Sequence, residues 1–110
     1  MSLAAQHCKP SVTALDAEAI AALLPQVPGW SLAGGKLVRS FGFRNYYETI
    51  AFVNALAWIA HREDHHPELV VGYKDCGVSY NTHSVGGALS SNDFICAAKL
   101  SALYAQRAGA

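Results

Sequence analysis

The sequence of 110 residues carries little charge, because Asp, Glu, Lys and Arg together make up only 15% of it, against about a quarter in a typical soluble domain. Eight basic side chains balance eight acidic ones, so no net field draws the chain to nucleic acid or to a membrane surface. No apolar run reaches the ~18 residues that a membrane-spanning helix needs, and no basic segment followed by an apolar run opens the chain. These absences predict a soluble protein without a secretion signal, whose partners are neither nucleic acid nor a membrane.

Cysteine is also scarce. Cys8, Cys76 and Cys96 are an odd number and include no Cys-x-x-Cys pair, so their spacing matches neither a disulfide framework nor a zinc site. We therefore expect free, mostly buried thiols and a reducing, cytoplasmic environment.

Apolar residues, by contrast, make up 52% of the chain, which excludes intrinsic disorder, and the length is that of one compact domain. Residues 1–14 show little periodicity and are expected to form a loose N-terminal tail, while residues 15–107 are expected to form a single domain. High apolar content with low charge also predicts that another subunit covers part of the surface.

The first half of the chain predicts a helix followed by a hairpin. Asp16 can cap the free amides of a helix that Pro25 ends. Residues 30–32 and 36–44 then have the pattern of two strands, joined by a turn at residues 33–35.

A long central helix is predicted next. Asn45 can cap it, and it must end by about His65, because Pro67 excludes the residue before it from helical geometry. Its apolar stripe consists of Phe52, Val53, Leu56, Ile59 and Ala60. Trp58 lies off this stripe, where it could serve a partner subunit.

The last third predicts a second hairpin and a final helix. Residues 69–73 and 76–83 have strand patterns, and Ser90 with Asp93 three residues later predicts a helix start. Since hairpins join the strands in pairs, we expect an α+β fold in two layers, with a four-stranded antiparallel sheet and three helices on one face. The expected order is α-β-β-α-β-β-α.

Histidine is the most informative residue type in the sequence. Four of the five histidines lie close together in the chain, namely His61, His65, His66 and His83. Because imidazole exchanges protons near neutral pH, such a cluster indicates a metal site, a proton-transfer site or chance.

A metal site is the less favoured interpretation. His61 and His65 are four residues apart on the expected helix, which suits a shared ion. The metalloprotease pattern, however, places Glu directly after the first His, where this chain has Arg62. No thiolate is expected on the side of the sheet that His83 occupies.

Proton transfer fits the positions better. His65 and His66 end the expected helix and His83 ends the last expected strand, and such ends are where rigid elements present side chains to a cleft. Two further positions remain open at this point. Asp93 could either satisfy helix amides or orient an imidazole, and Thr82 could be a plain strand residue or a ligand contact.

Together these residues resemble a known signature. The spacing His61-x3-His65-His66-Pro67-x5-Tyr73-x9-His83-x9-Asp93 is similar to that of the pterin-4a-carbinolamine dehydratases. The similarity extends over roughly residues 12–104 and includes Pro28-Gly29-Trp30, Phe41, Phe43, Phe52, Thr82 and Gly86-Gly87.

The resemblance implies an activity and a set of site residues. It implies dehydration of a 4a-hydroxytetrahydropterin to quinonoid dihydropterin and water, which recycles the cofactor of aromatic amino acid hydroxylases. It also implies no metal or organic cofactor and assembly into homodimers or homotetramers. Carried over residue by residue, it gives catalytic roles to His65, His66 and His83, with His66 as the first candidate for the acid–base group, and substrate-binding roles to His61, Pro67, Thr82 and Asp93.

Two features depart from the family pattern. His61 stands where an acidic residue is most common, and the segment 88–92 is one residue longer than usual. The resemblance also leaves other functions open, namely a non-catalytic binding, assembly or transcription-coactivator relative, or a dehydratase-like protein for another pterin such as a molybdenum-cofactor precursor. The presence of His65, His66 and His83 favours an active enzyme.

Overall fold

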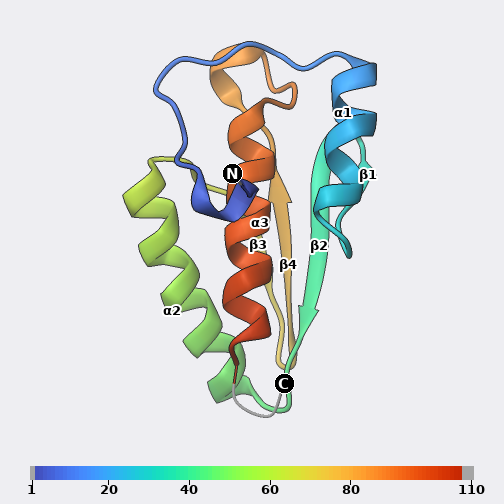
Figure 1. Cartoon of the computed structure of the whole chain (residues 1–110). Helices are drawn as coiled ribbons and strands as arrows, with labels where there is room; N and C mark the ends of the chain where they lie inside the picture. The colour runs from blue at the N-terminus through green and yellow to red at the C-terminus, as the bar shows by residue number, and fades with distance from the viewer. Residues whose placement is uncertain (1, 108–110) are drawn as a thin grey trace.

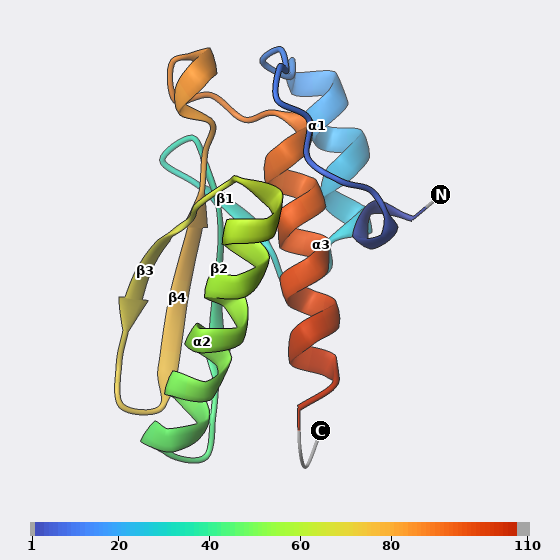
Figure 2. The same cartoon turned by 90° about the vertical axis from the view of Figure 1, so that its left-hand side faces the viewer.

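A computed structural model describes residues 2–107 and shows a sheet covered on one face by three helices (Figures 1 and 2). The main elements in chain order are α1 (Ala17–Leu23), β1 (Ser31–Ala33), β2 (Lys36–Gly42), α2 (Tyr46–Glu63), β3 (Glu68–Val71), β4 (Asp75–Tyr80) and α3 (Ser91–Ala105). All strand pairs are antiparallel, in the order β1-β2-β4-β3. The predicted fold class and element order are confirmed. None of the described helices is long and apolar enough to cross a membrane.

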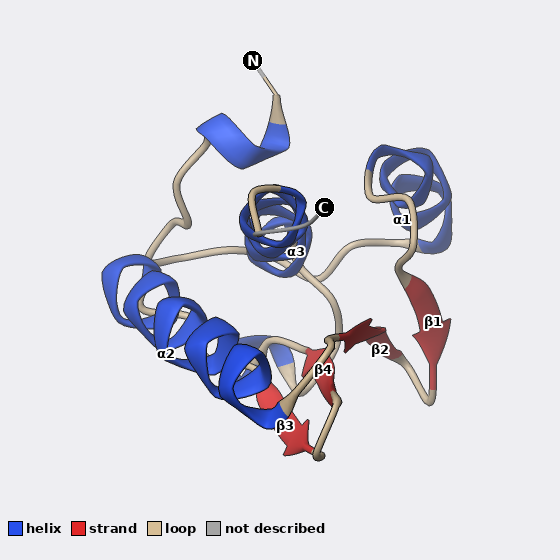
Figure 3. Cartoon of the chain, turned by 90° about the horizontal axis from the view of Figure 1, so that it is seen from below, coloured by secondary structure: helices blue, strands red, loops and turns tan. Residues whose placement is uncertain are grey.

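The sheet buries the face that the alternating pattern predicts. In the register between β2 and β4, Leu37 lies opposite Tyr80 and Phe41 lies opposite Cys76, and all four side chains are buried. α3 lies over this face, between α1 and α2 (Figure 3). β4 is a central strand of the sheet. The residues that follow it emerge at the same end of the molecule as the start of α3 (Figure 1).

α2 ends at Glu63, two residues before the limit of about His65 that Pro67 sets. Its buried positions are Thr49, Phe52, Leu56, Ala60 and Glu63, at helical spacing. Asp64 then adopts the left-handed conformation (φ 51°, ψ 42°), and its N–H bonds to the carbonyl of His61 while the N–H of His65 bonds to that of Ala60. This is a Schellman cap with Asp where glycine is usual, and it turns His65 out of the helix.

The Schellman cap leads to a stability prediction. A left-handed backbone costs a β-branched residue about 1–2 kcal/mol and costs glycine nothing. We expect Asp64→Val to lower the free energy of unfolding in urea by about 1–2 kcal/mol, and Asp64→Gly to stay within about 0.5 kcal/mol of the parent. Asn54→Val, at an exposed helical position of α2, is the control and should cost only a few tenths of a kcal/mol. Equal losses at both positions would contradict the cap.

A loose tail is expected over residues 1–14, of which residue 1 lies outside the described part of the chain, but the segment after it makes long-range contacts. The carbonyl of Ala4 accepts a hydrogen bond from Lys99 Nζ (2.8 Å), and the N–H of Cys8 donates to Glu63 Oε1 (2.8 Å). The N–H of Lys9 donates to Asn92 Oδ1 (2.9 Å). The partners Lys99, Glu63 and Asn92 come from α2 and α3, far away in the sequence, so local periodicity could not reveal these contacts. We call residues 7–12 the strap.

The strap makes stability depend on pH through Glu63. Burial alone would raise the pKa of Glu63, but the N–H of Cys8, the ring of His7 (2.9 Å) and Lys99 together outweigh burial and hold this pKa below its ordinary value. A carboxyl whose pKa is lower in the folded state adds stability above its unfolded pKa, and this stability is lost as the pH falls through the folded value.

We therefore expect Glu63→Gln to flatten the acid side of the stability curve. Its free energy of unfolding should be lower than that of the parent by about 1–3 kcal/mol at pH 7, because the N–H of Cys8 and the side chains of His7 and Lys99 lose a charged acceptor, and the difference should shrink below about pH 4.5. Urea unfolding from pH 3 to 7 measures this. Glu18→Gln, at an exposed position of α1, should keep the parent's slope, and a parallel curve for Glu63→Gln would contradict the argument.

Candidate active site

His65 is fixed on two sides as it leaves α2. Its ring stacks on that of Tyr80 from β4, with centroids 5.6 Å apart and planes 6° apart. Its Nε2 lies 2.6 Å from Oδ1 of Asp93 in α3. Burial raises the pKa of Tyr80, so this phenol stays neutral under the imidazole. The orientation of His65 is therefore set by the end of α2, by Tyr80 of β4 and by Asp93 of α3.

Asp93 is fully buried and joins the helix cap to the histidine. Its Oδ2 accepts hydrogen bonds from Thr82 Oγ1 (2.8 Å) and from the N–H of Ser90 (2.9 Å), while the Ser90 side chain caps α3. The predicted capping pair of Ser90 and Asp93 is confirmed. The same carboxylate also holds His65, so the two interpretations left open for Asp93 are both met in the structure.

The segment after β4 differs from the predicted strand over residues 76–83. β4 ends at Tyr80, and the chain then closes a tight loop in which the N–H of Thr82 bonds to the carbonyl of Ala88. Gly86 and Gly87 take positive φ angles of 71° and 83°, which a side chain would oppose. His83 consequently begins a single 3₁₀ turn, His83–Val85, and its side chain is exposed.

The end of α2 also differs from the prediction. His61 and His65 were expected on one helix face, but the left-handed Asp64 separates them, and this expectation is wrong. His61 is exposed on α2, beside the ring of Trp58 at a centroid distance of 6.3 Å. Among residues 2–107, no group of three or more His, Cys, Asp or Glu side chains is placed to hold a metal ion.

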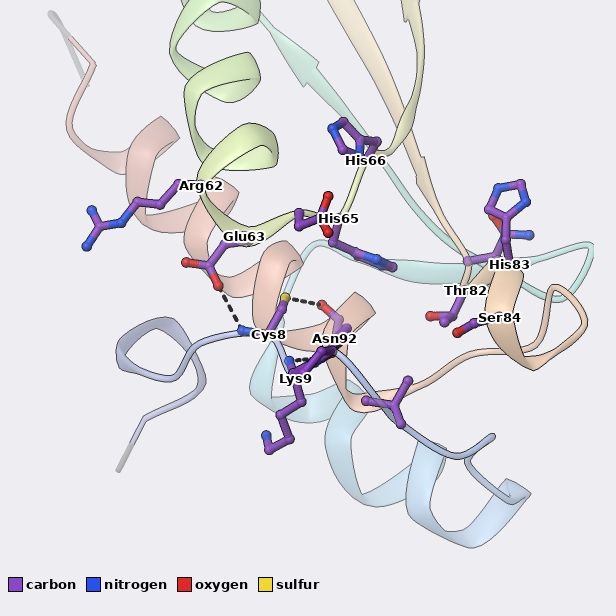
Figure 4. Close-up of a pocket in the computed structure, with 14 residues that line it drawn as sticks. Cys8, Lys9, Arg62, Glu63, His65, His66, Thr82, His83, Ser84 and Asn92 are labelled. Atoms are coloured by element: carbon purple, nitrogen blue, oxygen red, sulfur yellow. Dashed lines mark hydrogen bonds between the residues drawn. The ribbon is translucent and has the colours of Figure 1, made fainter.

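A cavity of about 490 Å³ lies where these segments meet (Figure 4). Its lining residues are Cys8, Lys9, Pro10, Val12, Arg62, Glu63, Asp64, His65, His66, Asn81, Thr82, His83, Ser84 and Asn92. The cavity thus brings together four of the residues expected from the sequence, His65, His66, Thr82 and His83. His61 and Pro67 are not among its lining residues, and Asp93 reaches it only through His65 and Thr82.

The arrangement suits proton transfer to a bound molecule. His66 and His83 are exposed side chains at the rim of the cavity, whereas His65 is held by a buried carboxylate. Imidazoles in these two settings can donate and accept protons at different positions of one bound molecule.

Sequence reasoning missed Glu63, Asn92 and the strap. Glu63 did carry a signal, because it continues the apolar stripe of Phe52, Leu56 and Ala60 at helical spacing, where a carboxylate needs a partner. Asn92 and Cys8 carried none, since their contacts join segments 55 or more residues apart.

The sequence is similar to known proteins over most of its length. The sequence model of a family described as pterin 4 alpha carbinolamine dehydratase matches residues 13–103. A protein of Xanthomonas oryzae pv. oryzae is 61% identical over 105 residues, covering 91% of this chain and 88% of its own. One of Nitrosospira multiformis is 52% identical over 105 residues, covering 93% and 92%. Both are named, as provisional assignments, pterin-4-alpha-carbinolamine dehydratases.

Solved structures share the fold. A crystal structure described as a transcriptional coactivator/pterin dehydratase from Brucella melitensis superposes with a TM-score of 0.78 at 27% identity, covering 83% of this chain and 98% of that one. A pterin dehydratase-like protein, described as a RuBisCO assembly factor in the alpha-carboxysome, gives a TM-score of 0.57 at 23% identity, covering 71% and 89%. The second likeness shows the fold alone.

Proposed function

Since the chain belongs to the pterin-4-alpha-carbinolamine dehydratase family, we propose that it dehydrates a 4a-hydroxytetrahydropterin to quinonoid dihydropterin and water. The observation that carries this proposal is the meeting of His65, His66 and His83 at one cavity, with His65 anchored by Asp93. The physiological role that follows is the recycling of the pterin cofactor of aromatic amino acid hydroxylases in the cytoplasm.

The reaction needs a proton for the leaving hydroxyl and a base afterwards. As the C4a–OH bond breaks, the lone pair of the neighbouring N5 forms the C4a=N5 double bond, water departs, and the ring gives up one proton. We assign the acid–base role to His66, whose exposed side chain lies at the cavity. A positioned acid–base group contributes about 10²–10⁴-fold to such a step.

His65 and His83 orient the pterin in this proposal. Because a carboxylate only accepts hydrogen bonds, the 2.6 Å contact with Asp93 places the proton of His65 on Nε2 and leaves Nδ1 as its acceptor atom. Thr82 donates a hydrogen bond to the other oxygen of Asp93 and so helps to fix the carboxylate that orients His65. His61 and Pro67, which the resemblance also gives substrate-binding roles, lie outside the lining of the cavity.

The experiment is a dehydration assay on purified protein. Chemically generated 4a-hydroxytetrahydrobiopterin loses water slowly by itself, and we expect the protein to accelerate this in proportion to its concentration. EDTA should leave the rate unchanged, and activity that chelation removes and zinc restores would refute the metal-free mechanism. A protein without any acceleration would be assigned instead to the non-catalytic binding or assembly functions.

We also propose that the chain forms a homodimer or homotetramer. Large apolar side chains are exposed on the edge strand β3 and on α2, including Val70 at 76% and Trp58 at 63% of their full surface. Such exposure on an edge strand favours a covering subunit. Light scattering at micromolar concentration should return a multiple of 11.7 kDa, and a value near 11.7 kDa itself would contradict the proposal.

A further inference from the structure

The strap runs past the end of α2 and the start of α3, the two helix ends next to His65 and Asp93. It leaves the N-terminal turn beside α2 and α3 and runs over the start of α3 toward α1 (Figure 1). The family model begins at residue 13, so the strap precedes the part of the chain that defines the family. The cavity nevertheless takes part of its lining from the strap, through Cys8, Lys9, Pro10 and Val12.

Buried partners hold the strap in place. The main chain of Lys9 makes two hydrogen bonds with the side chain of Asn92, donating to Oδ1 and accepting from Nδ2, both at 2.9 Å. The N–H of Cys8 donates to Glu63, and Cys8 Sγ lies 3.4 Å from Cys96 Sγ. Glu63, Asn92 and Cys96 are themselves buried, which gives these contacts little freedom.

Each of these partners is close in sequence to a residue of the site. Glu63 is two residues before His65, and Asn92 directly precedes Asp93. A shift of the strap would therefore disturb the same helix ends that position the histidine and its carboxylate. Figure 4 shows the strap residues Cys8 and Lys9 below the cavity, with His66 and His83 above it.

We propose that the strap is a substrate-positioning wall of this site, which holds the pterin ring against His66 and His83. The inference rests on the proposed function and extends it to residues outside the family segment. His66 acts as the acid–base group and His83 orients the ring on one side, and the strap supplies apolar contact surface on the other, through Pro10 and Val12. A wall of this kind contributes to binding equally in the ground state and the transition state, so its loss raises KM and leaves kcat nearly unchanged.

Alkylation of Cys8 tests the wall without any assay of turnover. Cys8 is the half-buried thiol that lines the cavity, while Cys76 and Cys96 are fully buried and serve as internal controls. We expect saturating 7,8-dihydrobiopterin to slow the labelling of Cys8 by N-ethylmaleimide about 10-fold, followed by peptide mass spectrometry. Binding of the same probe is measured separately by quenching of protein fluorescence.

The outcomes separate this proposal from the proposed function. Probe that binds without protecting Cys8 overturns the wall and leaves the dehydratase function standing. Failure of the probe to bind overturns both. If 7,8-dihydrobiopterin still protects Cys8 in a catalytically inactive His66→Ala variant, the result supports the role of the strap independently of turnover.

Variants of the strap give the kinetic counterpart. Val12→Ala removes two methyl groups from the wall and should raise KM about 5- to 10-fold with kcat within about twofold. Thr13→Ala, at the next residue, is exposed and outside the lining, and it should change neither constant. A Val12→Ala variant with parental KM, or one that loses kcat alone, would overturn the assignment.

Discussion

Replacing His66 with alanine is expected to lower turnover about 10²-fold or more, while the free energy of unfolding stays nearly unchanged. His66 is exposed and is not needed for burial, so the fold loses little when its ring is removed. The loss should fall on kcat, because the proton transfer that we propose for His66 takes place in the transition state. Dehydration of 4a-hydroxytetrahydrobiopterin, followed at saturating substrate, measures it.

His83→Ala is the comparison that tests the assignment of roles. If His83 mainly binds and orients the pterin, its loss should raise KM more than it lowers kcat. Near-parental turnover in His66→Ala together with a large loss in His83→Ala would reverse the two assignments. His66→Gln should behave as His66→Ala does, since an amide keeps polarity but exchanges no proton at neutral pH.

Local signals in the sequence predicted the order of the helices and strands correctly. Asp16, Asn45 and Ser90 were expected as helix caps, and each accepts a backbone N–H at the start of its helix. Their spacing, with the alternating pattern of β2 and β4, is enough to order the elements, because caps and periodicity act over only a few residues.

The exact ends of the site elements were not predictable in the same way. Asp64 takes a left-handed conformation that most sequences assign to glycine or asparagine, and this decides where His65 points. Thr82 and His83 alternate as a strand would, yet a loop closed by Gly86 and Gly87 bends them out of the sheet. In both places a tertiary contact with Asp93 stabilises a conformation that local propensity does not favour.

The second large effect is expected for Asp93→Asn, which keeps the volume of the side chain and changes its hydrogen bonding. Asp93 accepts from Thr82, from the N–H of Ser90 and from His65. An asparagine that keeps its oxygen on the first two must present its NH₂ to His65. Nε2 of His65 then has to accept, which moves the ring proton to Nδ1, the nitrogen to which our proposal gives the acceptor role.

We therefore expect Asp93→Asn to lower kcat about 10²-fold or more and the free energy of unfolding by about 1–3 kcal/mol. Asp93 acts here as a positioning residue, since it does not line the cavity and reaches it only through His65 and Thr82. Nitrogen-15 NMR of the imidazoles distinguishes this from general damage, because it should report the His65 proton on Nε2 in the parent and on Nδ1 in the variant. A variant that is inactive with the parental tautomer would refute the positioning role.

Ser90→Ala is the matched control for Asp93→Asn, because it weakens the same cap without touching the contact between Asp93 and His65. Loss of an N-cap side chain costs about 1 kcal/mol of stability, so both variants should unfold more easily than the parent. Only Asp93→Asn should lose turnover, since only it changes which nitrogen of His65 carries the proton. If Ser90→Ala lost turnover to the same extent, the effect of Asp93 would lie in the cap of α3, and the histidine would owe its position to the helix rather than to the carboxylate.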